Sequence, residues 1–587
     1  MVVASAVLTG AGVSRGHPAG LPLGDEFHAA MLTGCAEAAA ALTGEPMADE
    51  PDIDGRRNVL GCIEDCVEHG TVAGVLDLMR VRLPSEEHLL CALLAARGVL
   101  QITLNFDNGI ELGYALLTGQ TPLPPDAPEP YHRALAAWRA EMPPSPPLRV
   151  VSAPGRLDLD HRPLLVKLRG SVDADADAMV VPLRPTMEDL EGVLLDTDRR
   201  RALCAAVDSG HLLVVGHSGR DLDVFETLVP LLRPGRFDWV AAALTDRVAA
   251  RLAAVDPSQP RPGRAVDVLR AQLGALPAWP ARPLGDPDFG TRFAAWWRQV
   301  PPVAAAEAYG WLLSDAGRHT EAATVLRAVS RQPGLSPAAT ARIRVRLADA
   351  LARSGAPADT AEALRLWSGA ATGRGARTAL RAYAMIRRTE ARTATGHPPL
   401  LALPAAAAAL LLAQPTRARR RATVRVLIGI GRIALTHAET RRSLTAAAVA
   451  RAALASAVRG ARRAGTAHRQ SDLELLRLRT RIVRALLRGT PSPPVLGDLD
   501  TVNRAYLHRG NRAGQAEIHI ARALFALAEH DVAAFRAAVD AIGDAAFLGV
   551  HPHAAPELIR LRRWADHQGL TTPADSTVAR PPATGQA

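Results

Sequence analysis

The 587-residue chain is too long for a single hydrophobic core, which excludes a one-domain protein and predicts two or three domains. The net charge of +10 is divided unevenly: residues 1–240 carry 20 basic and 34 acidic side chains, and the remainder carries 49 basic and 25 acidic ones. The back half therefore suits an acidic partner, such as nucleic acid, an acidic protein or the front half itself, although a solvated arginine-rich surface is the more common explanation.

The first stretch, MVVASAVLTGAGVS, predicts a strand that ends in a glycine turn. Residues Val2 to Leu8 form an apolar, β-branched run, Gly10 and Gly12 interrupt it, and a helical pattern begins near Asp25. A strand, a glycine turn and a helix in this order can seat a phosphate, because glycine lets the backbone approach an anion and the helix amino terminus supplies N–H groups. Gly-x-Gly is common by chance, so the interpretation depends on later motifs.

Later segments of the front half predict strands and helices in alternation. Further strands are expected at about 99–104, 148–152, 164–168, 211–215 and 237–244. Helices are expected at about 57–82, 85–97, 186–207 and 221–232, with one short helix inside the Pro-rich stretch 120–147. This alternation, with polar turns after the strands, predicts an α/β fold: a doubly wound parallel sheet with one ligand-binding edge.

Two of the polar turns carry side chains suited to a ligand site. Asn105 and Asp107 follow the second strand, and the segment 216–221 follows the fifth. Open α/β sheets bind ligands outside the carboxyl ends of their strands, so these turns are candidate site segments. An ordinary turn capped by Asn and Asp is the alternative.

The back half predicts helices. Residues 246–302 are expected to form a Pro-rich linker or bridging element after a first domain of residues 1–245. Alanine, leucine and arginine then recur at helical spacing over residues 303–570, and the Pro- and Thr-rich residues 571–587 are expected to be disordered. Individual helices are predicted at about 421–436, 443–465, 471–488, 500–509, 512–529 and 531–544.

An imperfect repeat marks this helical domain. Gly317, Gly355 and Gly396 recur at similar spacing, and Glu-Ala pairs follow the first two. The pattern resembles the tetratricopeptide repeat, in which small residues let two antiparallel helices pack closely, and a stack of such pairs offers a groove for a partner. An ordinary helical bundle is the alternative. The basic cluster Arg417–Arg421 is expected to be an exposed helix start or loop, with a phosphate site as the less favoured interpretation.

Four motifs of the front half, taken in order, resemble the sirtuin family. They are Gly10-Ala11-Gly12-Val13-Ser14 with Gly20-Leu21-Pro22, Thr103-Leu104-Asn105-Phe106-Asp107, Lys167-Leu168-Arg169-Gly170-Ser171, and Val215-Gly216-His217-Ser218-Gly219-Arg220-Asp221. The second is similar to the family's Thr-Gln-Asn-Ile-Asp, and the third lies where the family has a strand ending in His-Gly. The resemblance covers about residues 1–240 and points to the bacterial sirtuin-like domains of antiphage defence proteins, which cleave NAD.

The resemblance implies a Rossmann-like sheet that binds NAD as substrate or ligand. It assigns the pyrophosphate and the adenosine ribose to Gly10, Ala11, Gly12, Ser14, Gly216, His217 and Ser218. Asn105 and Asp107 would face the nicotinamide ribose. Cleavage of the bond to nicotinamide passes through an oxocarbenium-like state, and Asn105 would hold the ribose and orient the attacking water.

The chain departs from the family at two points. The position of the family's general base is Arg169, and arginine stays protonated and cannot accept a proton, although it can hold a phosphate or a ribose oxygen. Another histidine, His17 or His217, would then be the base, or positioned water would suffice, or the domain would bind NAD without turnover. The family's four-cysteine zinc module is also missing, since Cys35, Cys62, Cys66, Cys91 and Cys204 form no Cys-x-x-Cys pair, which argues against deacylation.

These observations lead to the hypothesis of a cytoplasmic effector that hydrolyses NAD to nicotinamide and ADP-ribose in antiphage defence. Its candidate catalytic residues are Asn105 and Arg169, and its helical repeats would sense a protein trigger or self-associate. An inactive NAD or ADP-ribose sensor and an interaction scaffold with a decayed nucleotide domain are the alternatives. We expect no zinc, because the cysteine module is missing, and no secretory signal, because no basic region precedes the first apolar run. We also expect no membrane span, because the longest apolar run, 405–413, is too short. Nucleic acid is a less favoured partner.

Overall fold

The computed structural model describes the chain in seventeen segments. They are residues 3–47, 59–67, 77–152, 157–168, 171–172, 197–219, 222–242, 244–280, 288–316, 318–354, 357–372, 378–394, 416–464, 470–491, 494–508, 512–543 and 554–568. The chain divides into two compact units, one formed by residues 1–34 and 58–301 and the other by residues 35–57 and 302–587. Arg169, Gly170, the apolar run 405–413 and the tail 571–587 lie outside the described residues.

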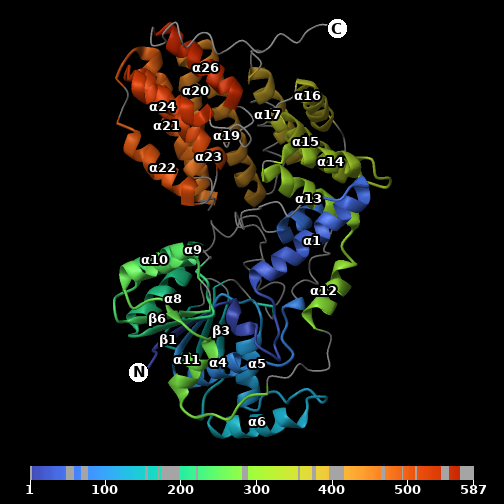
Figure 1. Cartoon of the computed structure of the whole chain (residues 1–587), viewed down its shortest axis with the longest axis vertical. Coiled ribbons are helices and arrows are strands. Elements are labelled where there is room, and N and C mark those ends of the chain that lie inside the picture. The colour runs from blue at the N-terminus through green and yellow to red at the C-terminus, as the bar shows by residue number, and fades with distance from the viewer. Residues whose placement is uncertain are drawn as a thin grey trace. The chain divides into compact units, whose positions relative to one another are not determined.

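The first unit is built on a seven-stranded sheet in the order β3-β4-β2-β1-β5-β6-β7. Figure 1 labels β1, β3 and β6 of this sheet. The strands are β1 Ala6–Thr9, β2 Leu100–Thr103, β3 Arg149–Val151, β4 Leu164–Lys167, β5 Leu212–Val215, β6 Phe237–Ala241 and β7 Arg261–Pro262. All neighbours are parallel, and Leu8 of the central strand β1 is level with Ile102 of β2 and Val214 of β5. The predicted parallel α/β sheet is therefore confirmed: β2 to β6 fall within the predicted strand segments, and β1 extends one residue beyond the predicted run, to Thr9.

Helices cover both faces of this sheet. Successive residues of a strand point to opposite faces, so Val7 of β1 enters one hydrophobic core while Leu8 enters the other. The Val7 core is closed by α4 Glu86–Ala96, α5 Gly109–Leu117, α6 Glu129–Ala140 and α11 Ala265–Leu273. The Leu8 core is closed by α8 Thr197–Asp208, α9 Leu222–Leu228, the 3₁₀ helix η2 Val229–Leu231 and α10 Asp246–Val255.

Residues 246–302, expected as a linker or bridging element, instead supply α10, β7 and α11 to the first unit, followed by α12 Phe289–Trp297. Leu269 of α11 is fully buried in the Val7 core, and Trp279 packs there and donates from its indole nitrogen to the Pro84 carbonyl at 3.0 Å. The sequence does not reveal this role, because the prolines are typical of a linker and β7 is too short, at two residues, to give a strand pattern.

Two other helix predictions in the front half differ from the structure. Within the range 57–82, where one long helix was expected, the structure has helix α2 Val59–Cys66. The predicted helix does not extend to Val81. The backbone N–H of Val81 donates to the Asn108 side chain at 2.8 Å and not to a helical carbonyl. Helix α5 was not predicted at all. The helix expected near Asp25 is confirmed as α1 Gly24–Thr43.

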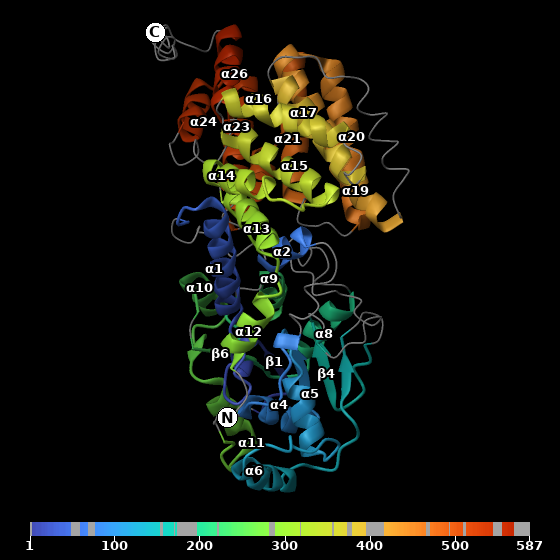
Figure 2. The same cartoon turned by 90° about the vertical axis from the view of Figure 1, so that its right-hand side faces the viewer.

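The described part of the second unit consists of helices (Figure 2). They are the part of α1 from Cys35 to Thr43, α13 Pro302–Asp315, α14 His319–Ser330, α15 Pro337–Ser354, α16 Pro357–Thr372, α17 Thr378–Ala394, α19 Thr416–Arg441, α20 Leu444–Ala464, α21 Gln470–Arg488, α22 Leu496–His508, α23 Arg512–Ala528, α24 Val532–Gly543 and α26 Ala554–His567. From α13 to α24, each described helix packs on the next one along the chain. The predicted helical back half is confirmed, and Arg417–Arg421 lies in the first turns of α19.

Small residues and buried ion pairs hold these helices together. A Cβ atom on Gly310 of α13 would lie 2.8 Å from Leu326 of α14, so glycine permits the close approach of this pair. Gly317, Gly355 and Gly396 lie outside the described residues. Fully buried Glu439 of α19 pairs with Arg479 of α21 at 2.7 Å and with Arg560 of α26 at 2.7 Å. Burial acts to raise the pKa of Glu439, but the two arginines outweigh it and lower that pKa below its usual value.

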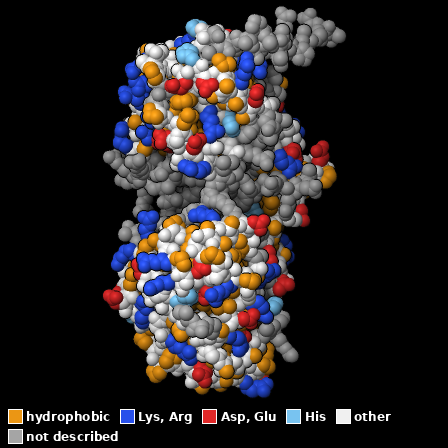
Figure 3. All heavy atoms as spheres, turned by 60° about the vertical axis from the view of Figure 1, so that its left-hand side comes forward, with side chains coloured by type: hydrophobic (Ala, Val, Ile, Leu, Met, Phe, Trp, Pro, Cys, Tyr) orange, Lys and Arg blue, Asp and Glu red, His pale blue; other side chains and the backbone are white. Residues whose placement is uncertain are grey.

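Many arginines of the second unit have acidic partners. The pairs include Arg318–Glu321, Arg327–Glu362, Arg342–Glu307, Arg387–Asp349, Arg479–Glu439 and Arg522–Asp500. On the face shown in Figure 3, the basic side chains are dispersed among acidic and hydrophobic ones. Part of the positive charge of the back half is therefore neutralised by ion pairs within the fold.

Candidate functional site

The carboxyl ends of β2, β1 and β5 are neighbours, so the sheet brings three of the predicted turns together. Gly10 follows β1, Asn105 lies two residues beyond β2, and Gly216 follows β5. Val13, in the segment that follows β1, enters the Val7 core on one face of the sheet, whereas α9, which follows β5, covers the other face. Ligands of open α/β sheets bind beside such a divergence, at the carboxyl ends of the strands.

The glycines of two turns pack backbone against backbone. The Gly10 N–H donates to the Val215 carbonyl at 3.1 Å, and the Gly12 N–H donates to the Gly216 carbonyl at 3.0 Å. A Cβ atom on Gly10 would lie 2.7 Å from the Gly216 oxygen, and one on Gly12 would lie 2.8 Å from the Gly216 Cα. These glycines are therefore required by the contact between the turns themselves, in addition to any part they take in holding a ligand.

Ser14 is the centre of a buried polar network beneath these turns. It ends the 3₁₀ helix η1 Ala11–Ser14 and is only 2% exposed. Its hydroxyl donates to Asp107 Oδ2 at 2.7 Å and accepts from Asn105 Nδ2 at 2.8 Å. His88 Nε2 lies 3.0 Å from the same oxygen. A hydroxyl offers one donor and two acceptor positions, so this network uses all of them when His88 donates.

The hydrogen bonds of His88 determine its tautomer. The Ser85 backbone N–H donates to His88 Nδ1 at 3.1 Å, so Nδ1 is unprotonated and the ring proton is on Nε2, where it is donated to Ser14. Burial lowers the pKa of His88, the Asp107 carboxylate opposes this effect, and the Lys167 ammonium adds to it. His88 is therefore a neutral hydrogen-bond donor with both nitrogens occupied, and it is not placed to act as a general base.

Sequence reasoning did not consider His88. It completes a capping box at the start of α4, in which the Ser85 side chain accepts from the His88 N–H and the His88 ring accepts from the Ser85 N–H. The signal in the sequence was Ser85 three residues before His88 at a helix start. Glu or Gln is the usual residue at the second position of a capping box, so the sequence pattern did not indicate one here.

The network fixes the carboxamide of Asn105. Both of its N–H groups are donated within the protein, one to Ser14 and one to the Gly10 carbonyl at 3.1 Å. Among the described residues, no hydrogen bond is made to Asn105 Oδ1, which leaves this acceptor for a ligand or a water molecule. Asp107 uses both carboxylate oxygens internally, since Oδ1 accepts from the Gly109 N–H at 2.9 Å and Oδ2 accepts from Ser14.

Ser14, His88 and Asp107 do not form a hydrolytic triad. In such a triad the serine gives its proton to the histidine, which the carboxylate orients. Here Ser14 donates to Asp107 and receives a hydrogen bond from His88, and the three residues are at most 6% exposed. The arrangement positions Asn105 and provides no accessible nucleophile.

The remaining predicted residues surround this network with different degrees of exposure. Ala11 is exposed at the start of η1, and Ser218 is half-buried. His217 is buried with its ring 5.3 Å from that of Trp239, whose indole N–H donates to the His217 carbonyl at 3.0 Å. His17 is exposed in the loop after η1. Arg169 lies outside the described residues, so its side chain is not placed.

No protein-family model matches the chain, and no curated protein matches it. In the described part of the chain, no three or more His, Cys, Asp or Glu side chains group as ligands for a metal ion. Within the same segments, no helix has the length and apolar character needed to cross a membrane. The function is therefore argued from the geometry around Asn105.

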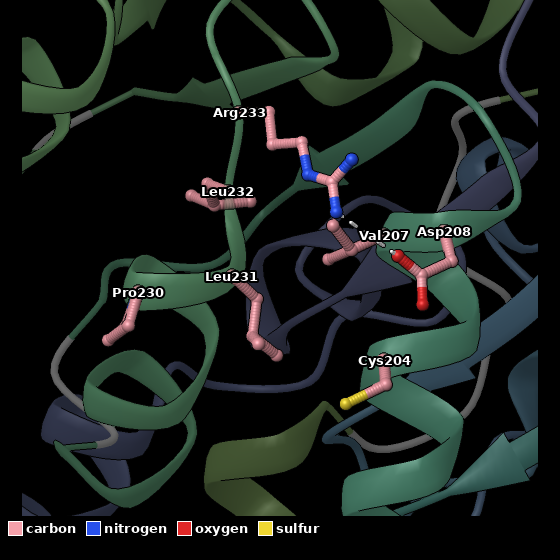
Figure 4. A pocket seen from close by; sticks show the side chains of 7 residues that line it. All are labelled: Cys204, Val207, Asp208, Pro230, Leu231, Leu232 and Arg233. Atoms are coloured by element: carbon pink, nitrogen blue, oxygen red, sulfur yellow. Dashed lines mark ion pairs between the residues drawn. The ribbon is translucent and has the colours of Figure 1, made fainter.

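A small cavity elsewhere in the first unit is separate from this site (Figure 4). It has a volume of about 190 Å³ and is lined by Cys204, Val207, Asp208, Pro230, Leu231, Leu232 and Arg233. Asp208 and Arg233 precede β5 and β6, so the cavity lies near the amino ends of these strands, whereas the Asn105 network lies at the carboxyl ends. Its only ion pair, Arg233 with Asp208 at 3.9 Å, is largely exposed. The cavity offers no chemistry for the proposed reaction.

Proposed function

We propose that the first unit is a Rossmann-like, sirtuin-type domain that binds NAD at the carboxyl edge of its sheet and hydrolyses it to nicotinamide and ADP-ribose. The observation that carries the proposal is the fixed carboxamide of Asn105, at the junction of β1, β2 and β5, whose Oδ1 accepts no hydrogen bond from the described residues. The resemblance of the four sequence motifs to sirtuins supports the choice of NAD.

The described geometry suits the requirements of this reaction. Departure of nicotinamide leaves an electron-deficient ribose carbon, and a water molecule held on the opposite face completes hydrolysis. Asn105 Oδ1 would accept a hydrogen bond from that water, and the rigid network beneath it would keep the water in place. The pyrophosphate would lie over the turn Gly10–Gly12, where the exposed residue Ala11 begins η1.

The reaction would proceed without a histidine base. His88 is neutral with its ring proton on Nε2, and Arg169 replaces the family histidine. Positioned water therefore supports hydrolysis in this proposal, and Arg169 would hold a ribose or phosphate oxygen. The same two observations favour one alternative, in which the domain binds NAD or ADP-ribose as a sensor and does not turn it over.

The second unit would regulate this activity. Each described helix from α13 to α24 packs on the next, as expected for a tetratricopeptide-like stack that binds a protein trigger or a second copy of the chain. Together the two units would form an effector that depletes NAD in antiphage defence. The defence role is supported by the motif resemblance and the two-unit architecture.

The decisive experiment measures NAD binding by calorimetry and nicotinamide release by chromatography, both on the full-length protein. Wild type is compared with Asn105→Ala and with Gln120→Ala, an exposed amide that serves as control. Hydrolysis predicts release by wild type and Gln120→Ala, with loss in Asn105→Ala. Binding without release, with turnover restored by Arg169→His, would instead establish the sensor. Absence of both binding and release would refute a nucleotide-binding function and favour the scaffold.

A further inference from the structure

Lys167 is the only lysine in the chain, and every other residue in the count of 69 basic side chains is an arginine. It ends strand β4, where it is level with Thr103 of β2, and its side chain is completely buried. Lysine is rarely buried without a specific partner, because removing an ammonium from water is costly. The position of this single lysine beside the Asn105 turn therefore requires an explanation.

The ammonium of Lys167 is saturated by three acceptors on the segment that follows β2. It donates to the carbonyls of Phe106, at 3.3 Å, and Asp107, and it pairs with Glu111 Oε1 of α5 at 2.6 Å. An ammonium has three N–H groups, so all of them are used. Burial raises the pKa of Glu111, and the Lys167 ammonium opposes this effect.

We propose that Lys167 is a positioning residue that holds the turn Asn105–Asn108 in the shape required for the proposed reaction. Its contacts fix the backbone on the carboxyl side of Asn105, while Ser14 and Gly10 fix the side chain. Glu111 is the counter-ion that makes the buried ammonium tolerable. The inference rests on the proposed function for its catalytic consequence, but the effect on the turn is independent of that function.

The geometry also explains the choice of lysine. A compact ammonium can direct three hydrogen bonds to diverging acceptors, whereas the planar guanidinium of arginine directs its donors within one plane. Every other Lys or Arg position in the chain is an arginine. The lysine at position 167 therefore indicates that a compact ammonium is required there. We therefore expect that arginine cannot replace lysine at this position, and that Lys167→Arg loses the positioning of the turn.

The test must separate positioning from stability. Removing one partner of a buried ion pair is strongly destabilising, whereas replacing both by apolar residues of similar size is often tolerated. The double variant Lys167→Met/Glu111→Leu is therefore compared with wild type, with Lys167→Arg, and with Arg233→Met. The last removes an exposed ion pair to Asp208 in the same unit, at the opposite end of the sheet from the turn.

Two measurements decide the outcome in full-length protein: steady-state nicotinamide release, and amide hydrogen exchange of peptides spanning 104–109. We expect the double variant to fold, to lower kcat about ten- to a hundredfold with little change in NAD affinity, and to exchange faster at the turn. Lys167→Arg should lower kcat likewise, and Arg233→Met should match wild type. Unchanged exchange and kcat in the double variant would overturn the inference. If wild type neither binds nor cleaves NAD, the proposed function fails, and the exchange difference alone still decides whether Lys167 positions the turn.

Discussion

Replacing Ser14 by alanine tests the buried network most directly, because the hydroxyl takes part in three hydrogen bonds. The change removes the donor to Asp107 at 2.7 Å and the acceptor of Asn105 at 2.8 Å, and it leaves the Nε2–H of fully buried His88 without its acceptor. Asn105 keeps its bond to Gly10, and Asp107 keeps its bond from Gly109.

The expected loss follows from these contacts. A hydrogen bond to a charged group contributes about 1.5–3 kcal/mol, and a buried donor left without an acceptor costs about 1–3 kcal/mol. We therefore expect Ser14→Ala to lower the free energy of unfolding of the first unit by about 3–5 kcal/mol. Ser218→Ala is the control, since this half-buried serine should change stability by no more than about 0.5 kcal/mol.

The assay is native-state hydrogen exchange on peptides from β2 and α5, because the chain has two units and a single melting temperature would not isolate the first. Exchange that requires unfolding should accelerate by more than about a hundredfold in Ser14→Ala. A loss below about 1 kcal/mol would refute the assignment of Ser14 as the shared partner of Asp107, Asn105 and His88.

Three further predictions follow from other contacts. Gly109→Ala would place a Cβ atom 2.4 Å from the His88 ring and should destabilise the first unit by about 1–3 kcal/mol, measured by hydrogen exchange of peptides from α5. Gly369→Ala, in open space on α16, should not accelerate the exchange of peptides from α16. The pKa of His88 is lowered from 6.5, so its stabilising contribution is complete above pH 6.5 and decreases as the pH falls toward the folded-state pKa; hydrogen exchange across this range should show the slope in wild type and not in His88→Gln. Arg479→Leu leaves buried Glu439 with fewer partners and should cost the second unit about 3–5 kcal/mol, measured by hydrogen exchange of peptides from α19 and α21. Glu439→Leu in the same chain should partly reverse this loss.

The sequence alone predicted which segments of the front half become strands. Apolar runs such as 211–215 are bounded by glycine and polar turns, and these local features are sufficient to define a buried parallel strand. Because all the strands are parallel, the polar residues after them were also expected at one edge, and the structure places Gly10, Asn105 and Gly216 there. Strand β7 was missed because two residues give no periodicity.

Only the tertiary structure determined how the side chains at this edge are connected. Ser14, His88 and Asp107 come from three separate segments, and neither spacing nor composition indicates that they meet. The same is true of Lys167 and Glu111, which become neighbours because β4 pairs with β2 and α5 begins just beyond the turn after β2. Local sequence determines the elements by short-range periodicity and turn chemistry, whereas hydrogen bonds between distant residues depend on strand order and on which helix covers which face of the sheet.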